Sequence, residues 1–254
     1  MKESVVLLHG FAGTHRAFDG VVELLAHTRY LPLALDLPGH GDERGAPQPI
    51  TFEACVQHVL SRSPKRFLLC GYSMGGRVAL HVALAAPERV SGLLLVATNP
   101  GIEDPDERAQ RLASDEQLAQ QLETGSYEQF IERWRTQPLF AMDPPHVGEL
   151  ARADQRRNDP LVLAAVLRGL GTGSMASLWE ALSTLRMPTC VLVGERDEKF
   201  RALGKRMAKL LPQAELAIVA GGHGLPLENP AALAQALAAL VQRSPVSATN
   251  PRPV

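Results

Sequence analysis

Six short apolar runs, each followed by a small or polar residue, constrain the fold of this chain more than any other feature of its sequence. Bounded runs of three to five apolar residues, as found here, are typical of strands that are buried on both faces. Helix-like stretches such as residues 75–86 and 202–211 alternate with the runs. This alternation predicts an α/β fold with a mostly parallel, doubly wound sheet. The runs are residues 5–8, 33–35, 67–70, 93–97, 190–193 and 216–219.

A long segment between the fourth and fifth runs interrupts this alternation. Helix-like stretches follow one another there without an apolar run between them, and Gly and Pro residues separate them. We therefore expect a helical cap at residues 99–186, inserted into an α/β core of residues 1–98 and 187–243. Residues 244–254 are rich in Pro, Ser, Thr and Asn and are expected to form a flexible tail. The predicted cap helices are residues 109–122, 127–136, 147–156, 161–170 and 175–185.

The sequence G-Y-S-M-G at residues 71–75 lies between a predicted strand and a predicted helix. In that context the G-x-S-x-G spacing is typical of a nucleophile elbow, a sharp turn that exposes a serine hydroxyl at the top of the sheet. Small residues are needed around the serine because the backbone folds back closely, and Gly76 adds one where the helix must pack against the strand. Ser73 is therefore the predicted nucleophile, with an ordinary glycine-rich turn as the alternative.

A serine nucleophile needs a histidine base, and the histidine needs a carboxylate that fixes its tautomer and stabilises the imidazolium. In folds with this elbow, the acid and then the histidine follow the serine along the chain. His223 follows the last apolar run, whereas His146 lies within the helical segment, so His223 is the predicted base. Asp197 follows the fifth run and is the preferred acid, with Glu195 of the same loop as the alternative.

Backbone N–H groups near the elbow are candidates for an oxyanion hole. Negative charge that develops on a substrate oxygen requires preorganised hydrogen-bond donors. The N–H of Met74, directly after the predicted nucleophile, is one expected donor. The loop after the first run reads H-G-F-A-G at residues 9–13, and the N–H of Phe11 is the expected second donor.

The charge balance and the cysteines limit the possible partners. The chain has 26 Lys and Arg residues and 27 Asp and Glu residues, a net charge of -1, which excludes bulk attraction to nucleic acid or to an anionic membrane. Cys55, Cys70 and Cys190 are far apart, so neither a zinc site nor a disulfide framework is indicated. No apolar run is long enough for a signal peptide or a membrane span. We expect a cytoplasmic protein, and its oligomeric state is left open.

Phrases spread over almost the whole chain resemble the α/β-hydrolases: HGF, DLPGHG, GYSMGGR, GERDEKF and AGGHGLPLENP, in this order. More narrowly, GYSMGGRVAL, RWRTQPLF, LRGLGTGSMASLW and GERDEKFRAL resemble the 2-succinyl-6-hydroxy-2,4-cyclohexadiene-1-carboxylate synthases of menaquinone biosynthesis. The resemblance implies a lyase in which Ser73 takes a proton from a succinyl-bearing cyclohexene substrate and pyruvate is eliminated, without an acyl-enzyme. It implies a polycarboxylate substrate and no metal or organic cofactor.

The same resemblance implies which residues bind the substrate. Arginine suits a polycarboxylate because its planar fork binds carboxylates through two hydrogen bonds. Arg77 and Arg111 fall at arginine positions of the synthase family, and Tyr72 and Trp134 also match its pattern.

The family has a further cap arginine, expected just before Asn158. Alignment without a gap places Gln155 at the position of this arginine. A shift of one residue places Arg156 there, and Arg156 is the candidate for substrate binding. Residues 100–187 contain 9 Arg, no Lys and 14 Asp and Glu residues, a net charge of -5. A polycarboxylate can therefore bind only if a few arginines converge on the pocket while the carboxylates of the cap face water.

Other functions remain compatible with the same residues. A serine carboxylesterase or C–C bond hydrolase would use the same triad, with attack by Ser73 or by an activated water. A catalytically silent binding protein of this fold is disfavoured by the complete triad. Ser73 itself excludes the aspartate nucleophile of dehalogenases.

Overall fold

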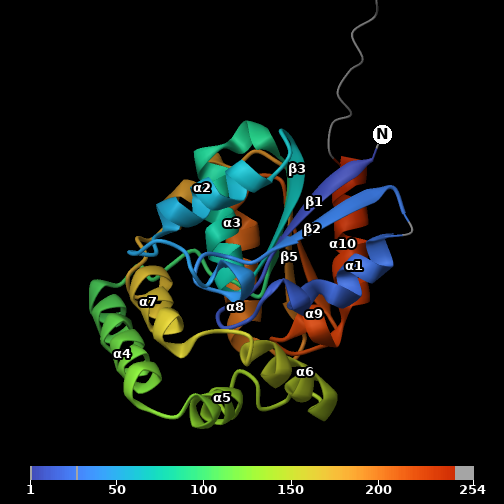
Figure 1. The fold of residues 1–254 in the computed structure, drawn as a ribbon. Coiled ribbons are helices and arrows are strands. Elements are labelled where there is room, and N and C mark those ends of the chain that lie inside the picture. Colours follow the sequence, from blue (N-terminus) through green and yellow to red (C-terminus); the bar gives the residue numbers. More distant parts are fainter. Residues whose placement is uncertain (1, 27, 244–254) are drawn as a thin grey trace, which may run out of the picture.

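Six parallel strands form the sheet at the centre of the fold, which Figure 1 shows between two layers of helices. The computed structural model describes residues 2–26 and 28–243. The strand order is β2-β1-β3-β4-β5-β6, and each neighbouring pair is parallel. The strands are β1 (Glu3–Leu8), β2 (Tyr30–Leu35), β3 (Phe67–Tyr72), β4 (Val90–Val96), β5 (Thr189–Gly194) and β6 (Ala214–Val219).

The predicted sheet is confirmed, since each of the six apolar runs forms part of one strand. All residues of β4 and β5 are buried, as expected for strands covered by helices on both faces. The edge strand β2 begins at Tyr30 and contains Pro32. A proline can be accommodated in an edge strand because one side of such a strand makes no ladder hydrogen bonds.

Helices cover both faces of this sheet. Helices α1 and α10 pack together on one face, and α2 and α3 pack together on the other (Figure 1). Helix α8 packs against β5 and β6. None of the helices in the described ranges combines the length and apolarity needed to cross a bilayer. The bounds are α1 (Asp19–Ala26), α2 (Phe52–Arg62), α3 (Met74–Ala85), α8 (Glu198–Leu210), α9 (Leu225–Glu228) and α10 (Pro230–Arg243).

The helices between β4 and β5 lie beyond the carboxyl ends of the strands (Figure 1). We call residues 99–186, which contain them, the helical insertion. Arg168 on α7 pairs with Glu116 and Glu123 on α4, which ties these two helices together. The predicted tail, residues 244–254, lies outside the described residues. The helices of the insertion are α4 (Pro105–Thr124), α5 (Tyr127–Arg135), α6 (Pro145–Gln155) and α7 (Pro160–Leu170).

The fifth predicted cap helix, residues 175–185, is wrong. Only a short 3-10 turn, Glu180–Thr184, forms there. Met175, Trp179 and Leu182 are buried and spaced like one face of a helix, which produced the misleading periodicity. They are instead anchors of an irregular segment, in which the Trp179 indole donates to the carbonyl oxygen of Gly101 at 3.0 Å.

Candidate active site

Ser73 occupies the tight turn between β3 and α3. Its φ of 52° and ψ of -111° are values that residues with a side chain seldom adopt. The Ser73 N–H donates to the carbonyl oxygen of Val96 at 2.9 Å, and the Thr98 hydroxyl donates to the Ser73 carbonyl oxygen at 2.7 Å. The end of β4 therefore holds the serine backbone in the geometry of an elbow.

Two glycines allow this turn to pack closely on its neighbours. A Cβ atom on Gly75 would lie 2.5 Å from the carbonyl oxygen of His9, and one on Gly76 would lie 2.5 Å from the Cβ of Thr98. Both separations are shorter than non-bonded atoms tolerate. The small residues predicted around the serine are therefore required by close approach of the backbone.

Replacing Gly75 by alanine is expected to lower the free energy of unfolding by about 3 kcal/mol, because the new methyl group meets rigid backbone. Gly45→Ala is the matched control, since a Cβ atom there has no neighbour within 4 Å. The control should change the free energy by no more than about 0.5 kcal/mol. Urea unfolding curves compare the two variants, and equal midpoints would contradict the tight packing of the elbow.

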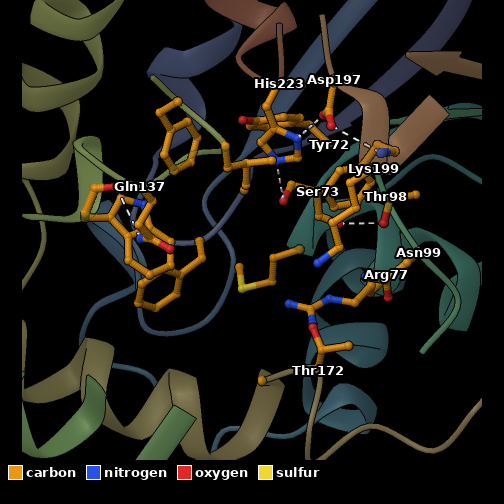
Figure 2. A pocket seen from close by; sticks show the side chains of 18 of the residues that line it. Tyr72, Ser73, Arg77, Thr98, Asn99, Gln137, Thr172, Asp197, Lys199 and His223 are labelled. Carbon is orange, nitrogen blue, oxygen red and sulfur yellow. Dashed lines mark hydrogen bonds and ion pairs between the residues drawn. The ribbon is translucent and has the colours of Figure 1, made fainter. Parts of the chain in front are cut away.

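His223 and Asp197 complete a chain of hydrogen bonds that starts at the serine hydroxyl (Figure 2). The Nε2 atom of His223 lies 3.2 Å from Ser73 Oγ, and its Nδ1 atom lies 2.7 Å from Asp197 Oδ2. The other carboxylate oxygen of Asp197 accepts from the N–H of Phe200 at 3.1 Å, at the start of α8. Both His223 and Asp197 are buried, so the imidazole is shielded from competing water. This arrangement has the geometry of a catalytic triad.

The structure distinguishes between the two predicted acids. Asp197 contacts His223, whereas the Glu195 side chain is 57% exposed and its charged neighbour is Arg196 at 4.0 Å. Asp197 therefore has the position of the triad acid, and Glu195 does not.

Phe11 and Met74, the residues whose N–H groups are the expected donors of an oxyanion hole, both lie near Ser73. Both residues line the same cavity as Ser73, and a Cβ atom on Gly10 would lie 3.4 Å from the Cβ of Ser73. Within residues 2–26 and 28–243, neither N–H meets a hydrogen-bond acceptor. The two donors are therefore free to bind an oxygen of a ligand.

A cavity of about 740 Å³ separates the triad from the helical insertion. Ser73 and His223 lie on its core side, and Leu118, Trp134 and Leu167 line it from the insertion. Such a volume suits a small organic molecule rather than a polymer.

Arg77 lies in the wall of this cavity as a buried and unpaired cation. It is 7% exposed, and its guanidinium donates a hydrogen bond to the hydroxyl of Thr172 (Figure 2). No carboxylate of the described residues lies within 4.0 Å of it. Burial lowers the pKa of Arg77 to about 10, and the charge of Arg111 acts in the same direction. Asp115 offsets this effect only through its longer-range attraction, so the buried charge of Arg77 has no directly paired carboxylate among the described residues, which is costly.

Arg111 approaches the same cavity from α4. Its Nε atom lies 2.8 Å from Asp115, a buried carboxylate that also accepts from the N–H of Gly173 at 3.3 Å. Asp115 thereby orients Arg111, which lines the same cavity as Arg77.

Comparisons with known proteins agree with this geometry. The family model described as "Alpha/beta hydrolase family" matches residues 5–236. The chain belongs to the α/β hydrolase family.

Relatives within this family point to one group of enzymes. A 2-succinyl-6-hydroxy-2,4-cyclohexadiene-1-carboxylate synthase from Salmonella agona (strain SL483) is 32% identical over 242 residues, which are 94% of this chain and 94% of that protein. MenH from S. aureus has a solved structure with a TM-score of 0.88 and 30% identity, covering 95% of this chain and 94% of that one. A malate-bound esterase from Thermogutta terrifontis shares the fold, with a TM-score of 0.82, 24% identity and coverage of 96% and 91%.

Tyr72 and Trp134, the two aromatic residues that the resemblance implies for substrate binding, also line the cavity next to the triad. The ring of Tyr72 lies 5.4 Å from that of His223, and the ring of Trp134 lies 5.1 Å from that of Phe11. Burial raises the pKa of Tyr72, so its hydroxyl stays protonated as a hydrogen-bond donor. Trp134 joins the helical insertion to the candidate oxyanion loop.

Arg156 does not reach the cavity, which corrects its prediction. It follows the end of α6, is 47% exposed and binds Glu128 on the surface through Nε and Nη2. Gln155, the residue of the gap-free alignment, is buried against a second, smaller cavity that adjoins Tyr72 and Trp134. At the last turn of a helix, a shift of one residue changes the direction of a side chain by about 100°.

Several polar residues that line the cavity were not identified from the sequence. Thr98 and Asn99 follow β4 after one residue, Ala97, so their place near the carboxyl end of a strand was an available signal. Thr172 is recognisable only from its contact with Arg77, 95 positions away. The missed polar residues that line the cavity include Thr98, Asn99, Gln137, Thr172 and Lys199 (Figure 2).

One group of possible metal ligands occurs in the described part of the chain, and it lies apart from this cavity. His15, Asp36 and Asp42 have ligand atoms within 4.8 Å of one another. Asp36 accepts from the N–H groups of His15 at 2.6 Å and Asp42 at 2.9 Å. Its carboxylate is thus already used to fix two loops.

Proposed function

We propose that this protein is a lyase of menaquinone biosynthesis that releases pyruvate from a succinyl-enolpyruvyl-hydroxycyclohexene carboxylate. The observation that carries the proposal is Arg77, a buried guanidinium that lines the triad cavity without a carboxylate partner in the described chain. Relatives that cover 94% of the chain are named for the synthase reaction, which supports the same activity.

The cavity offers charges that complement such a substrate. The molecule carries carboxylates on its succinyl, enolpyruvyl and ring portions. Arg77, Arg111 and Lys199 all line the cavity. Arginine forks bind carboxylates through paired hydrogen bonds, and burial strengthens the attraction. We assign the substrate carboxylates to these cations, and the helical insertion acts as the cap that encloses them.

Ser73 acts as the base in the proposed reaction. His223 accepts the hydroxyl proton through Nε2, and Asp197 stabilises the resulting imidazolium. The serine oxygen then removes the ring proton next to the succinyl carbonyl, and the electron pair of that C–H bond moves onto the carbonyl oxygen as an enolate. When the enolate reverts to a ketone, its electron pair forms a new ring double bond and the C–O bond to the enolpyruvyl group breaks. The leaving enolate takes up the proton held by His223 and becomes pyruvate.

The Phe11 and Met74 N–H groups stabilise the intermediate charge. As the proton leaves, the succinyl carbonyl oxygen becomes an enolate oxygen. Two free N–H donors beside the serine provide the preorganised field that such an oxygen needs, and each donor of this kind contributes about 3 kcal/mol in known oxyanion holes. The reaction needs no group from outside the chain, and we place it in the cytoplasm, where free thiols such as the buried Cys55, Cys70 and Cys190 stay reduced.

A serine carboxylesterase or C–C bond hydrolase is the alternative, because the same triad could attack a carbonyl directly. Purified protein should release pyruvate from the succinyl-enolpyruvyl substrate and hydrolyse p-nitrophenyl acetate only slowly. Coupling the product to lactate dehydrogenase measures pyruvate, and absorbance of p-nitrophenol measures hydrolysis. Efficient ester turnover without pyruvate would replace the lyase assignment with the hydrolase.

A further inference from the structure

The helical insertion sends a buried polar side chain to the turn that carries Phe11. Asn158 lies between α6 and α7 and is 7% exposed. Its Nδ2 atom donates to the carbonyl oxygen of Ala12 at 2.8 Å, and its Oδ1 atom accepts from the N–H of Gly41 at 2.9 Å. One side chain of the insertion therefore joins two loops of the core.

The turn that contains Ala12 needs external support. The N–H of Gly13 donates to the carbonyl oxygen of Gly10 at 3.1 Å, which closes a turn with Phe11 and Ala12 at its centre. Ala12 has a φ of 59°, in the left-handed region that disfavours residues with a Cβ atom. Such a conformation persists only when the surroundings hold it in place.

Both peptide groups of Ala12 are held by buried side chains. Its N–H donates to the Nε2 atom of His40 at 3.3 Å, and its carbonyl oxygen accepts from Asn158. Burial lowers the pKa of His40, so its ring stays neutral and keeps an acceptor for this N–H. The 2.8 Å bond from Asn158 is the shorter of the two, and it is the one that comes from the helical insertion.

A second contact fastens the insertion to the far end of the same loop. Asp154, near the end of α6, accepts from the N–H of Thr14 at 2.8 Å and from the Thr14 hydroxyl. Residues 12 and 14 are thus both bound by the α6–α7 junction, while Phe11 between Gly10 and Ala12 has a free N–H.

We propose that Asn158 is a positioning residue for the oxyanion hole: it holds the Ala12 peptide so that the Phe11 N–H points at the developing oxyanion. The hole is then complete only while the helical insertion is docked on the core. This inference rests on the proposed oxyanion role of Phe11, and it adds that the insertion takes part in catalysis through the backbone as well as through substrate contacts.

The test compares Asn158→Leu with Tyr127→Phe. Leucine keeps the approximate shape but removes all three hydrogen bonds of the Asn158 side chain, to Ala12, Gly41 and Gln155. Tyr127 donates to the carbonyl oxygen of Gln155 at 2.5 Å, an acceptor that Asn158 also contacts at 3.2 Å, so Tyr127→Phe removes a bond of the same junction without touching the turn. We expect kcat for pyruvate release to fall by about 10- to 100-fold in Asn158→Leu with KM within about twofold of wild type. The Tyr127 variant should keep its kcat.

A readout that needs no turnover separates positioning from simple loss of stability. Phenylboronic acid forms a tetrahedral adduct with a reactive serine and places an oxygen in the oxyanion hole, whereas benzoic acid occupies the cavity without that bond. Asn158→Leu should lower the affinity for phenylboronic acid about 10-fold and leave the affinity for benzoic acid unchanged. If Asn158→Leu does not fold, Asn158→Asp replaces it in the same measurements. Aspartate keeps an acceptor for the N–H of Gly41 but loses the donor to the carbonyl oxygen of Ala12.

Equal losses for the boronate and for benzoic acid, or equal losses in the Asn158 and Tyr127 variants, would overturn the positioning role. Wild-type protein that binds phenylboronic acid but releases no pyruvate would instead overturn the proposed function alone, and the boronate comparison would still decide the role of Asn158.

Discussion

Replacing Ser73 by alanine is expected to reduce kcat for pyruvate release by at least about 1,000-fold. The hydroxyl oxygen is the proposed base, and His223 Nε2 lies 3.2 Å from it. Alanine leaves the imidazole without the group that transfers the proton. Arg77 and Arg111 remain, so affinity for the substrate should change by less than about threefold.

Stopped-flow or single-turnover pyruvate release measures this loss, and equilibrium dialysis of the substrate with the inactive variant measures affinity. Ser183→Ala is the control, because this exposed serine lies outside the cavity and its hydroxyl donates to the carbonyl oxygen of Glu180. Retained turnover in Ser73→Ala, with a folded protein and an unchanged control, would remove the serine from the reaction and with it both the lyase and the hydrolase mechanisms.

Replacing Arg77 by methionine should have opposite effects on activity and stability. We expect kcat/KM to fall by about 10-fold or more, because a charged contact with a substrate carboxylate is lost. Burial lowers the pKa of Arg77 to about 10, which corresponds to roughly 3 kcal/mol of unfavourable surroundings for the charged form. Methionine removes that charge from an apolar wall, so the free energy of unfolding without substrate should rise by about 1 to 3 kcal/mol.

Arg156→Met provides a matched arginine control. Its partner Glu128 is exposed, and such surface pairs contribute at most about 1 kcal/mol. Steady-state kinetics and urea unfolding of the two variants should therefore separate clearly, with an unchanged kcat/KM for Arg156→Met. A fall in stability together with normal kinetics in Arg77→Met would show that the Arg77 charge serves the fold and not the substrate.

The parts of the site that the sequence predicted well are those fixed by local rules. The elbow around Ser73 follows from glycine spacing between a strand and a helix, and the position of His223 follows from the carboxyl end of the last strand. The choice of Asp197 over Glu195 needed the structure, because these two residues of the same loop differ in the direction of their side chains. For the same reason the sequence could not show that the Arg156 side chain, at the end of a helix, points to the surface.

Other features could not be predicted because they depend on contacts between distant segments. Thr172 and Asn158 carry no motif, and their importance arises only where the helical insertion meets the core. The predicted helix at residues 175–185 failed for a related reason. Buried anchors such as Trp179 mimic helical periodicity when an irregular segment packs closely against its surroundings.

The order in which the chain is synthesised gives the long-range contacts of the site a further consequence. Ala12 and Asn158 are 146 positions apart, and Ser73 and His223 are 150 apart. A ribosome therefore completes the elbow and the turn long before their partners emerge. Until α10 emerges, the nascent chain presents β3, β4 and β5 without one of the helices that pack on them, and strands exposed in this way are prone to aggregate. The contact between Ser73 and His223 forms only after the helical insertion has been synthesised.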